Sequence, residues 1–450
     1  MTATSSEVGQ MINRFDPGAA HTLSEADQRL LARRRATLGD IYPLFYDKPV
    51  HVVRGSGAWL VDADGVEYLD AYNNVPAVGH ANPRVAKAVY AQLTRMNTHT
   101  RYLQDGVVEF AERFLATHPA HLDHVIFTNS GSEANDLALT IAKWRTGNEG
   151  VIVTRMAYHG TTSLLAGVSP ENGPGMPVAP FVRVVDPPDT FRYGDAAGAM
   201  FAAAVGEAID ELTASGLGVA ALLIDTIMST DGIFPGPRGM LAEAFRAVQA
   251  AGGLVIADEV QPGMARIGEA MWGFQRHTDQ VDLVTSGKPL AGGLPIGSLV
   301  LPAELSDGYA AGHRYFNTFG GNPASIAAAG AVLDEVQERG LMRGALEVGA
   351  ALRRSIAEAS ATSPYVADVR GVGLFIGVEM VDREGQPSRD VARRVVNGLR
   401  DRNVLISAVG RLGQVLKVRP PLVFTHDDAT AFLTAYRAVL DELDQEGSHG

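Results

Sequence analysis

The chain contains no cysteine among its 450 residues. This absence excludes disulfide bonds, zinc sites built on thiolates and cysteine nucleophiles. We predict no metal site from the sequence.

Positive charge is also scarce. The 38 Lys and Arg residues are outnumbered by 51 Asp and Glu residues, which gives a formal net charge of −13. Proteins that bind nucleic acid present a basic surface, and no run rich in Lys or Arg occurs in this chain. We therefore predict no nucleic-acid partner.

Long apolar runs are absent as well. No stretch reaches the ~20 apolar residues that a membrane crossing needs, and residues 1–18 are polar, unlike a secretory signal. We therefore expect a cytoplasmic protein without a membrane partner. Contents of 46% apolar and 20% charged residues are typical of a globular protein with a large core, and the length allows two or three domains.

Residues 283–293 are an apolar run that ends at Lys288 and continues as small, glycine-rich chain. At the end of a buried strand, low dielectric favours the neutral amine of a lysine. A neutral amine can attack a carbonyl and form a Schiff base. An isolated lysine in this position is more often solvated, so the interpretation depends on residues elsewhere in the chain.

Residues 253–261 form a second apolar run, which ends in two carboxylates and an amide. Asp258 precedes Lys288 by 30 residues (288 − 258), a separation that fits two strands with a short connection. Ligands of open α/β sheets gather at the carboxyl ends of the strands. Alone, such an acid commonly caps a helix or binds a metal. Together with a Schiff-base lysine it forms the pair that pyridoxal phosphate (PLP) needs, because the acid keeps the pyridine nitrogen protonated.

Six motifs, in order along most of the chain, resemble the class III aminotransferases among the fold-type I PLP enzymes. They are SGSEAN at 130–135, YHG at 158–160, DEVQ at 258–261, SGK at 286–288, FGGNP at 319–323 and RPPL at 419–422. Each motif is weak alone, and the set is specific.

The resemblance implies an α/β fold with a large domain and a smaller α+β domain built from both termini. The large domain would hold a mostly parallel, doubly covered sheet. We assign residues 1–70 to the N-terminal segment and part of the small domain, 71–325 to the large PLP-binding domain and 326–450 to the C-terminal small domain. Residues 169–198 are rich in Pro, Gly and Asp and predict a long surface excursion.

The turn at Gly131 and Ser132 joins an apolar strand to a helix. The unpaired N–H groups and positive dipole of a helix N-terminus suit a phosphate there, although a plain serine-capped turn is the alternative. In that helix we expect Glu133 and Asn135 to serve as first-turn residues with a capping role. An aromatic ring at Tyr158 could stack on a pyridine ring.

The resemblance implies a full set of cofactor residues, with Lys288 and Asp258 as the catalytic pair. The cofactor-binding residues would be Gly131, Ser132, Tyr158, His159, Asp258, Val260, Gln261, Lys288 and Thr318. Gln261 would donate to the ring 3-oxygen of PLP. His159 would either touch Asp258 or act as a structural hydrogen bonder.

The resemblance also places substrate residues and a partner. Tyr72 and Asn73 would face the substrate amine, and Arg419 would bind a carboxylate through its planar fork, unless it forms a structural ion pair. Thr318 would reach the cofactor phosphate of a second subunit, which implies a homodimer with shared active sites; a simple loop hydroxyl is the alternative. Asp225 replaces a glutamate that can pair with the substrate-side arginine, which puts that gating role in doubt. Whether dimers pair into tetramers is open.

We predict that the protein transfers an amino group from an amine or amino acid to a keto acid or aldehyde. The reaction would be ping-pong, through a Lys288 Schiff base. Residues 72–74, 99–102 and 417–421 also resemble phospho-lyases that act on phosphorylated amino alcohols and need no keto acid. An aminomutase is a third chemistry. A non-catalytic PLP-binding module is a further alternative, disfavoured by the intact lysine and the lack of a basic DNA-binding segment.

Overall fold

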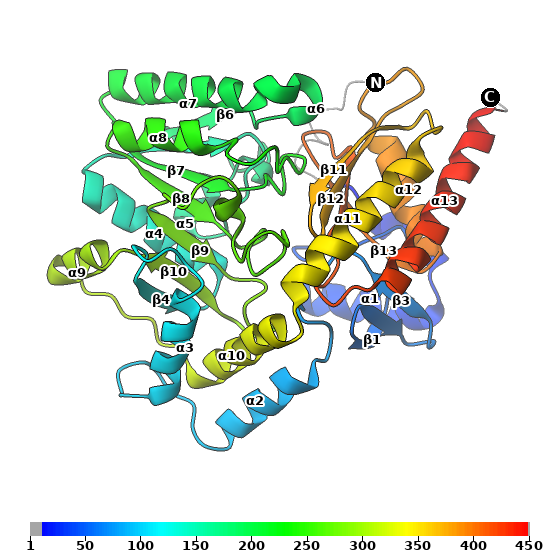
Figure 1. Ribbon diagram of the computed structural model, residues 1–450. Helices are drawn as coiled ribbons and strands as arrows, with labels where there is room; N and C mark the ends of the chain where they lie inside the picture. The colour runs from blue at the N-terminus through cyan, green and yellow to red at the C-terminus, as the bar shows by residue number, and fades with distance from the viewer. Residues whose placement is uncertain (1–10, 449–450) are drawn as a thin grey trace.

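A seven-stranded sheet organises the larger part of the structure (Figure 1). The computed structural model describes residues 11–448. The strands are β4 (His124–Thr128), β5 (Gly150–Thr154), β6 (Val182–Val185), β7 (Val219–Asp225), β8 (Leu254–Asp258), β9 (Leu283–Ser286) and β10 (Gly297–Leu301). Their spatial order is β4-β10-β9-β8-β7-β5-β6. Because β10 alone runs antiparallel to its neighbours and the other pairs are parallel, the predicted mostly parallel sheet is confirmed.

Both faces of this sheet are buried, as alternate residues of its strands show. In β5, Val151 and Val153 belong to one apolar cluster, whereas Ile152 belongs to another. The helices that cover the faces include α4 (Gly131–Thr146), α7 (Ala197–Ala214) and α8 (Ala242–Ala250). Figure 1 shows α7 and α8 together over one side of the sheet. A strand buried on both faces reads as a continuous apolar run, which is why these strands are visible in the sequence.

Two four-stranded sheets, in the orders β1-β2-β3-β13 and β11-β12-β15-β14, make up the smaller part. Their strands are β1 (Val52–Ser56), β2 (Trp59–Asp62), β3 (Glu67–Asp70), β11 (Val366–Val372), β12 (Phe375–Met380), β13 (Val404–Leu405), β14 (Ser407–Val409) and β15 (Val415–Val418). β13 pairs with β3, so segments near both ends of the chain share one sheet. The domain boundaries drawn from the sequence stay a prediction.

The remaining helices connect and cover these sheets. They are α1 (Glu25–Leu38), α2 (Pro83–Leu93), α3 (Asp105–Leu115), α5 (Ser163–Ala166), α6 (Thr190–Tyr193), α9 (Ala303–Gly312), α10 (Pro323–Glu338), α11 (Leu341–Ser360), α12 (Arg389–Asp401) and α13 (His426–Ser448). In Figure 1, α10 leads from the large sheet to α11, which lies with α13 beside the smaller sheets. Within residues 11–448, no helix has the length and apolar character that a membrane crossing requires.

The prediction of a surface excursion at residues 169–198 is wrong in part. This segment contains β6, the edge strand of the large sheet, which pairs in parallel with β5. The strand has four residues, of which Val182 and Val185 are buried. So short a run between proline-rich turns carries little local signal, and only its pairing with β5 defines it as a strand.

Candidate active site

Three neighbouring strands of the large sheet end side by side. The register pairs Asp225 of β7 with Asp258 of β8, and Asp258 with Thr285 of β9. Lys288 follows the end of β9, so the two catalytic residues expected from the sequence meet at one edge of the sheet. A cavity of about 300 Å³ opens there. The residues that line it include Gly131, Ser132, Tyr158, His159, Asp225, Asp258, Val260, Gln261 and Lys288.

Asp258 is buried and held by hydrogen bonds to both carboxylate oxygens. Its Oδ2 accepts from Asn135 Nδ2 at 2.9 Å and contacts His159 Nδ1 at 2.7 Å. Its Oδ1 accepts from the backbone N–H of Val260 at 3.1 Å. Because a carboxylate only accepts, the His159 tautomer with hydrogen on Nδ1 fits this contact. His159 Nε2 is buried and has no hydrogen-bond partner among the described residues.

Asn135 has a role that the sequence did not reveal. Besides Asp258, its Nδ2 donates to the carbonyl of His159 at 2.9 Å, and its Oδ1 accepts from Thr285 Oγ1 at 2.5 Å. The expected capping role holds for Glu133, which accepts from the backbone N–H of Asn129 at 2.9 Å. It is wrong for Asn135, whose side chain links α4 to two strand ends. The partners lie more than twenty residues away in sequence, so no local pattern indicates them.

The N-terminus of α4 forms one wall of the cavity. Ser130 caps the helix by accepting from the N–H of Glu133 at 3.2 Å. Glycine keeps the approach to this wall open, since a Cβ at Gly131 would lie 2.6 Å from Val260 Cγ2. The N–H groups of Gly131 and Ser132 have no acceptor within the described part of the chain. Free N–H groups at a helix N-terminus suit a phosphate.

Lys288 is exposed to the open cavity and surrounded by protein. The surrounding protein keeps water away from the Lys288 amine, and this desolvation lowers the pKa of the amine. The positive charge of Arg419 lowers that pKa further. The carboxylates of Asp258 and Asp225 act in the opposite direction. A larger fraction of the Lys288 amine is therefore neutral than for a lysine in water, which suits nucleophilic attack and proton transfer.

Two buried cations donate hydrogen bonds to Gln261. Lys417 and Arg419 lie two residues apart at the end of β15, where side chains of alternate residues point the same way. Lys417 Nζ donates to Gln261 Oε1 at 2.8 Å and to the carbonyl of Ser229 at 2.9 Å. Arg419 donates to the same Gln261 oxygen through Nη1, and to the carbonyl of Tyr72 through Nε at 3.1 Å. Within residues 11–448 neither cation has a carboxylate oxygen at ion-pair distance.

Lys417 was not among the site residues expected from the sequence. Burial is the main cause that lowers the pKa of both Lys417 and Arg419, and each is further affected by its charged neighbours. Lys417 belongs to the segment 417–421 that resembles phospho-lyases, and the resemblance assigns no role to it. Alternation along a strand could have placed it beside Arg419, but not beside Gln261.

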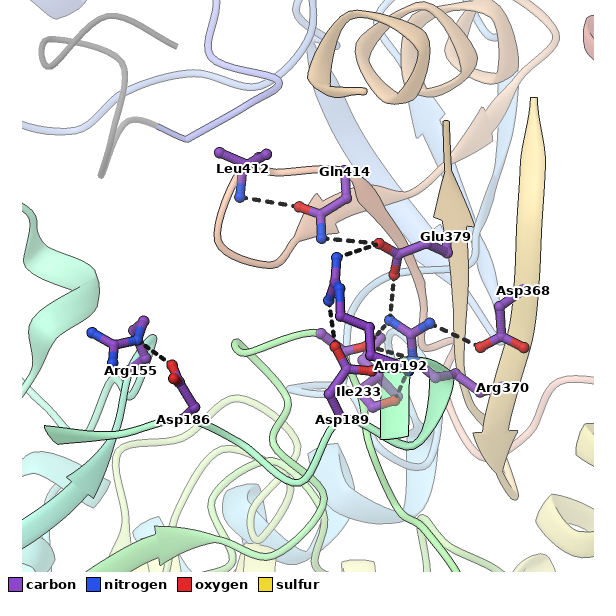
Figure 2. A network of polar contacts seen from close by, with 11 residues as sticks. Arg155, Asp186, Asp189, Arg192, Ile233, Asp368, Arg370, Glu379, Leu412 and Gln414 are labelled. Carbon is purple, nitrogen blue, oxygen red and sulfur yellow. Dashed lines mark hydrogen bonds and ion pairs between the residues drawn. The ribbon is translucent and has the colours of Figure 1, made fainter. Parts of the chain in front are cut away.

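A polar network connects the loop between β7 and α8 to the four-stranded sheet β11-β12-β15-β14 (Figure 2). Arg370 of β11 donates to the carbonyls of Gly232 at 2.7 Å and Ile233 at 3.0 Å, and to Glu379 of β12 at 2.7 Å. Glu379 also accepts a hydrogen bond at 3.1 Å from Gln414, the residue just before β15. The same loop supplies the Ser229 carbonyl that receives Lys417. The network therefore fixes both sides of that contact.

Comparison with known proteins now places the chain. The sequence model of the family described as aminotransferase class-III matches residues 44–440. The chain belongs to the class III aminotransferase family. An alanine–glyoxylate aminotransferase 2-like protein of Drosophila melanogaster is 37% identical over 92% of this chain and 87% of its own. An ethanolamine-phosphate phospho-lyase homolog of Caenorhabditis elegans is 33% identical over 94% of this chain and 96% of its own.

Solved structures of a phospholyase and of an aminotransferase share the fold. A phospholyase from Arthrobacter, in complex with phosphoethanolamine, superposes with a TM-score of 0.89 and 44% identity, covering 92% of this chain and 99% of that one. The ornithine aminotransferase of Toxoplasma gondii gives a TM-score of 0.80 at 25% identity, covering 95% and 97%. The cofactor of this class III family member is therefore PLP.

The residues around the cavity fit PLP. The free N–H groups at the start of α4 suit its phosphate, and Asp258, fixed by its hydrogen bonds, suits a protonated ring nitrogen. Tyr158 lines the cavity, as expected of a ring that stacks on the cofactor. These residue roles remain predictions, drawn from the family and from the geometry.

Some substrate-side and partner-side residues expected at this site do not line the cavity around Lys288. Tyr72 and Asn73 do not line the cavity: Tyr72 lies under the Arg419 guanidinium at 5.1 Å, and Asn73 Nδ2 donates to Asp70 at 3.0 Å. Asp70 and Arg419 engage this loop, and the expectation that the Tyr72 and Asn73 side chains face the substrate amine stays a prediction. Thr318 is exposed and does not line the cavity of its own chain, so its contact with a second subunit stays a prediction.

Proposed function

We propose that this chain releases phosphate from a phosphorylated amino alcohol, one of the two main reactions that the sequence left open. The observation that carries the proposal is the pair of buried cations, Lys417 and Arg419, on the neutral oxygen of Gln261. Buried charges are normally paired. Two buried cations without a carboxylate partner, close to a reactive lysine, are suited to bind the anionic group of a substrate. A phosphate dianion matches two cations, whereas a single guanidinium fork satisfies a carboxylate.

Asp225 adds support. It lines the cavity, yet its oxygens lie outside ion-pair distance of Lys417 and Arg419. The glutamate of many family members is one methylene longer and can neutralise the arginine. The shorter side chain of Asp225 leaves both cations available. Burial also raises the pKa of Asp225, which lowers the fraction that carries negative charge.

The relatives agree with this proposal. The Arthrobacter protein at 44% identity is a phospholyase in complex with phosphoethanolamine, and the Caenorhabditis elegans relative is named as an ethanolamine-phosphate phospho-lyase homolog. The ornithine aminotransferase, by contrast, is 25% identical.

Lys288 is the residue that moves the proton in this reaction. PLP, when bound, withdraws electrons from the carbon that carries the amine. The Lys288 amine takes the proton from that carbon as a general base. The C–O bond on the neighbouring carbon then breaks, and the phosphate leaves with the bonding electrons toward Lys417 and Arg419. With one water consumed, the products are inorganic phosphate, ammonia and an aldehyde.

Amino transfer is the second candidate. It is favoured by the 37% identical relative named as an aminotransferase-like protein and by Arg419, which alone could hold a substrate carboxylate. An amine or amino acid would then pass its amino group to a keto acid or aldehyde in a ping-pong reaction. Lys288 would move the same proton, and no phosphate would be released.

One experiment separates the two reactions. PLP-loaded protein is given phosphoethanolamine without any keto acid, and inorganic phosphate and ammonia are measured together. Equal amounts of both products support the phospho-lyase. A reaction that proceeds only with a keto acid, and leaves the phosphate on the substrate, contradicts it and favours amino transfer.

A homodimer with shared active sites also belongs to this proposal. Thr318 lies in the sequence among exposed aromatic residues. The exposed fractions are 69% for Phe319, 43% for Tyr315 and 40% for Phe316. Exposed apolar clusters of this kind mark protein interfaces, and a second copy would cover this one. Light scattering of the purified protein tests the dimer and distinguishes it from a tetramer.

A further inference from the structure

We propose that Gln261 is a positioning residue for the substrate phosphate. In the substrate-free site its Oε1 holds Lys417 and Arg419 together, and a phosphate that reaches both cations replaces that oxygen. This inference rests on the proposed function, because it takes these two cations as the phosphate site.

The contacts of Gln261 define the orientation of its amide. The oxygen and nitrogen of a glutamine amide are usually assigned from their hydrogen bonds. Here both neighbours are cations that can only donate, so the atom facing them must be Oε1. Two donors occupy both lone pairs of this oxygen. Nε2 is left without a hydrogen bond to any residue in 11–448, on a side chain that lines the Lys288 cavity.

The two cations keep donors for an anion. Lys417 has three N–H groups and uses two, and the Arg419 guanidinium has five and uses two. Because both cations share one acceptor, the donating nitrogens lie at most about 6 Å apart, the length of two hydrogen bonds. Two oxygens of one phosphate can therefore be reached at the same time.

Gln261 lies between the cavity and the cations. It lines the cavity, whereas Lys417 and Arg419 do not. An anion that enters from the side of Lys288 therefore meets the Gln261 amide first. Charged acceptors form stronger bonds to Lys and Arg than neutral amides do, so the phosphate takes both cations and Gln261 Oε1 is released.

The neutrality of Gln261 is what makes this exchange favourable. An amide oxygen satisfies the geometry of the two cations without cancelling their charge. A glutamate of the same size would form ion pairs with both, and a substrate phosphate would have to break them. The side chain at position 261 therefore sets how strongly the site prefers a phosphorylated substrate.

The exchange also reaches the cofactor. Gln261 Nε2 is the donor expected to face the ring 3-oxygen of PLP. Once Oε1 loses both cations, the amide is no longer held in one orientation, and the surroundings of that ring oxygen change. We therefore expect inorganic phosphate alone to alter the absorbance of the bound cofactor.

The test uses inorganic phosphate and the PLP-loaded protein. Affinity is measured by calorimetry and the cofactor response by absorbance, for the wild type, Gln261→Glu and Gln261→Met. We expect Gln261→Glu to weaken phosphate binding by about tenfold or more, because its carboxylate competes for the cations. We expect Gln261→Met to bind phosphate but to lose the absorbance response. The matched control is Gln280→Glu, the same change at an exposed position, which should behave as the wild type.

The outcomes separate this inference from the proposed function. If the wild type releases phosphate from phosphoethanolamine and Gln261→Glu binds phosphate equally well, the role of Gln261 is overturned and the proposed function stands. An absorbance response kept in Gln261→Met also overturns it. If Gln261→Glu does not fold, the Gln261→Met comparison decides alone. A wild type that releases no phosphate from phosphoethanolamine overturns the proposed function directly.

Discussion

Asn135 Nδ2 donates to Asp258 Oδ2 at 2.9 Å, although 123 residues separate them in the chain. Asn135 lies in α4, whose N-terminus suits the cofactor phosphate, and Asp258 ends β8 and suits the protonated ring nitrogen. One side chain therefore sets the distance between the two ends of the cofactor site.

Replacement of Asn135 by alanine should loosen the cofactor as well as the fold. The change removes hydrogen bonds to Asp258, His159 and Thr285, and unsatisfied buried groups cost about 1–3 kcal/mol of unfolding free energy. We expect faster loss of PLP on dialysis, followed by absorbance. Asn148→Ala is the control, since it removes a bond to Val219 in the same sheet, far from Asp258. Equal PLP retention in both variants would contradict the role of Asn135.

Lys288→Ala should abolish turnover. Within residues 11–448 no other lysine lines the cavity, so the variant lacks the general base. Borohydride reduction of the PLP-loaded wild type, followed by peptide mass spectrometry, should place the adduct on Lys288. The variant should give no adduct at this site. A reduced adduct on a different lysine in the wild type would show that the assignment is wrong.

Lys417→Met should reduce the use of phosphorylated substrates selectively. The change removes one of the two cations but keeps the apolar stem, and loss of a charged hydrogen bond to substrate costs about 1.5–3 kcal/mol, or roughly 10–150-fold in kcat/KM. Binding of the unphosphorylated amino alcohol, followed by the cofactor absorbance, should be equal in both proteins, because this ligand carries no phosphate for Lys417 to contact. Lys48→Met, at an exposed position, serves as the control. A uniform loss with both substrates would argue for a structural role.

The contribution of Glu259 to stability should fall as pH rises from about 4.5 to 8. Glu259 is fully buried, and desolvation raises its pKa from 4.5 to about 8 against hydrogen bonds from Gly273, Phe274 and Thr226. Between these values the folded state binds the proton that the unfolded state has lost. The unfolding free energy therefore decreases with pH, by at most about 1.4 kcal/mol per unit for one group.

Urea unfolding across this pH range, compared between the wild type and Glu259→Gln, isolates the contribution of Glu259. The glutamine does not titrate, so its curve should be flatter than that of the wild type. Parallel curves would contradict the raised pKa.

Much of the fold and the centre of the site are visible in the sequence because their signals are local. A strand buried on both faces is a continuous apolar run, and an acid or lysine that ends such a run marks the carboxyl edge of a sheet. This identified Asp258 and Lys288. It also predicted the mostly parallel sheet.

The rest was decided by the tertiary structure, because it depends on residues that meet only when distant strands are in register. Lys417 and Gln261 are 156 residues apart, and their contact requires β15 of the small sheet to face the end of β8. The four residues of β6 are a strand only because β5 lies beside them. Tyr72 and Asn73 stay predicted substrate residues, and only the structure shows that the Tyr72 carbonyl accepts from Arg419 and that Asn73 donates to Asp70. A local sequence pattern indicates the chemistry that a side chain can perform, and tertiary packing determines which residues that side chain contacts.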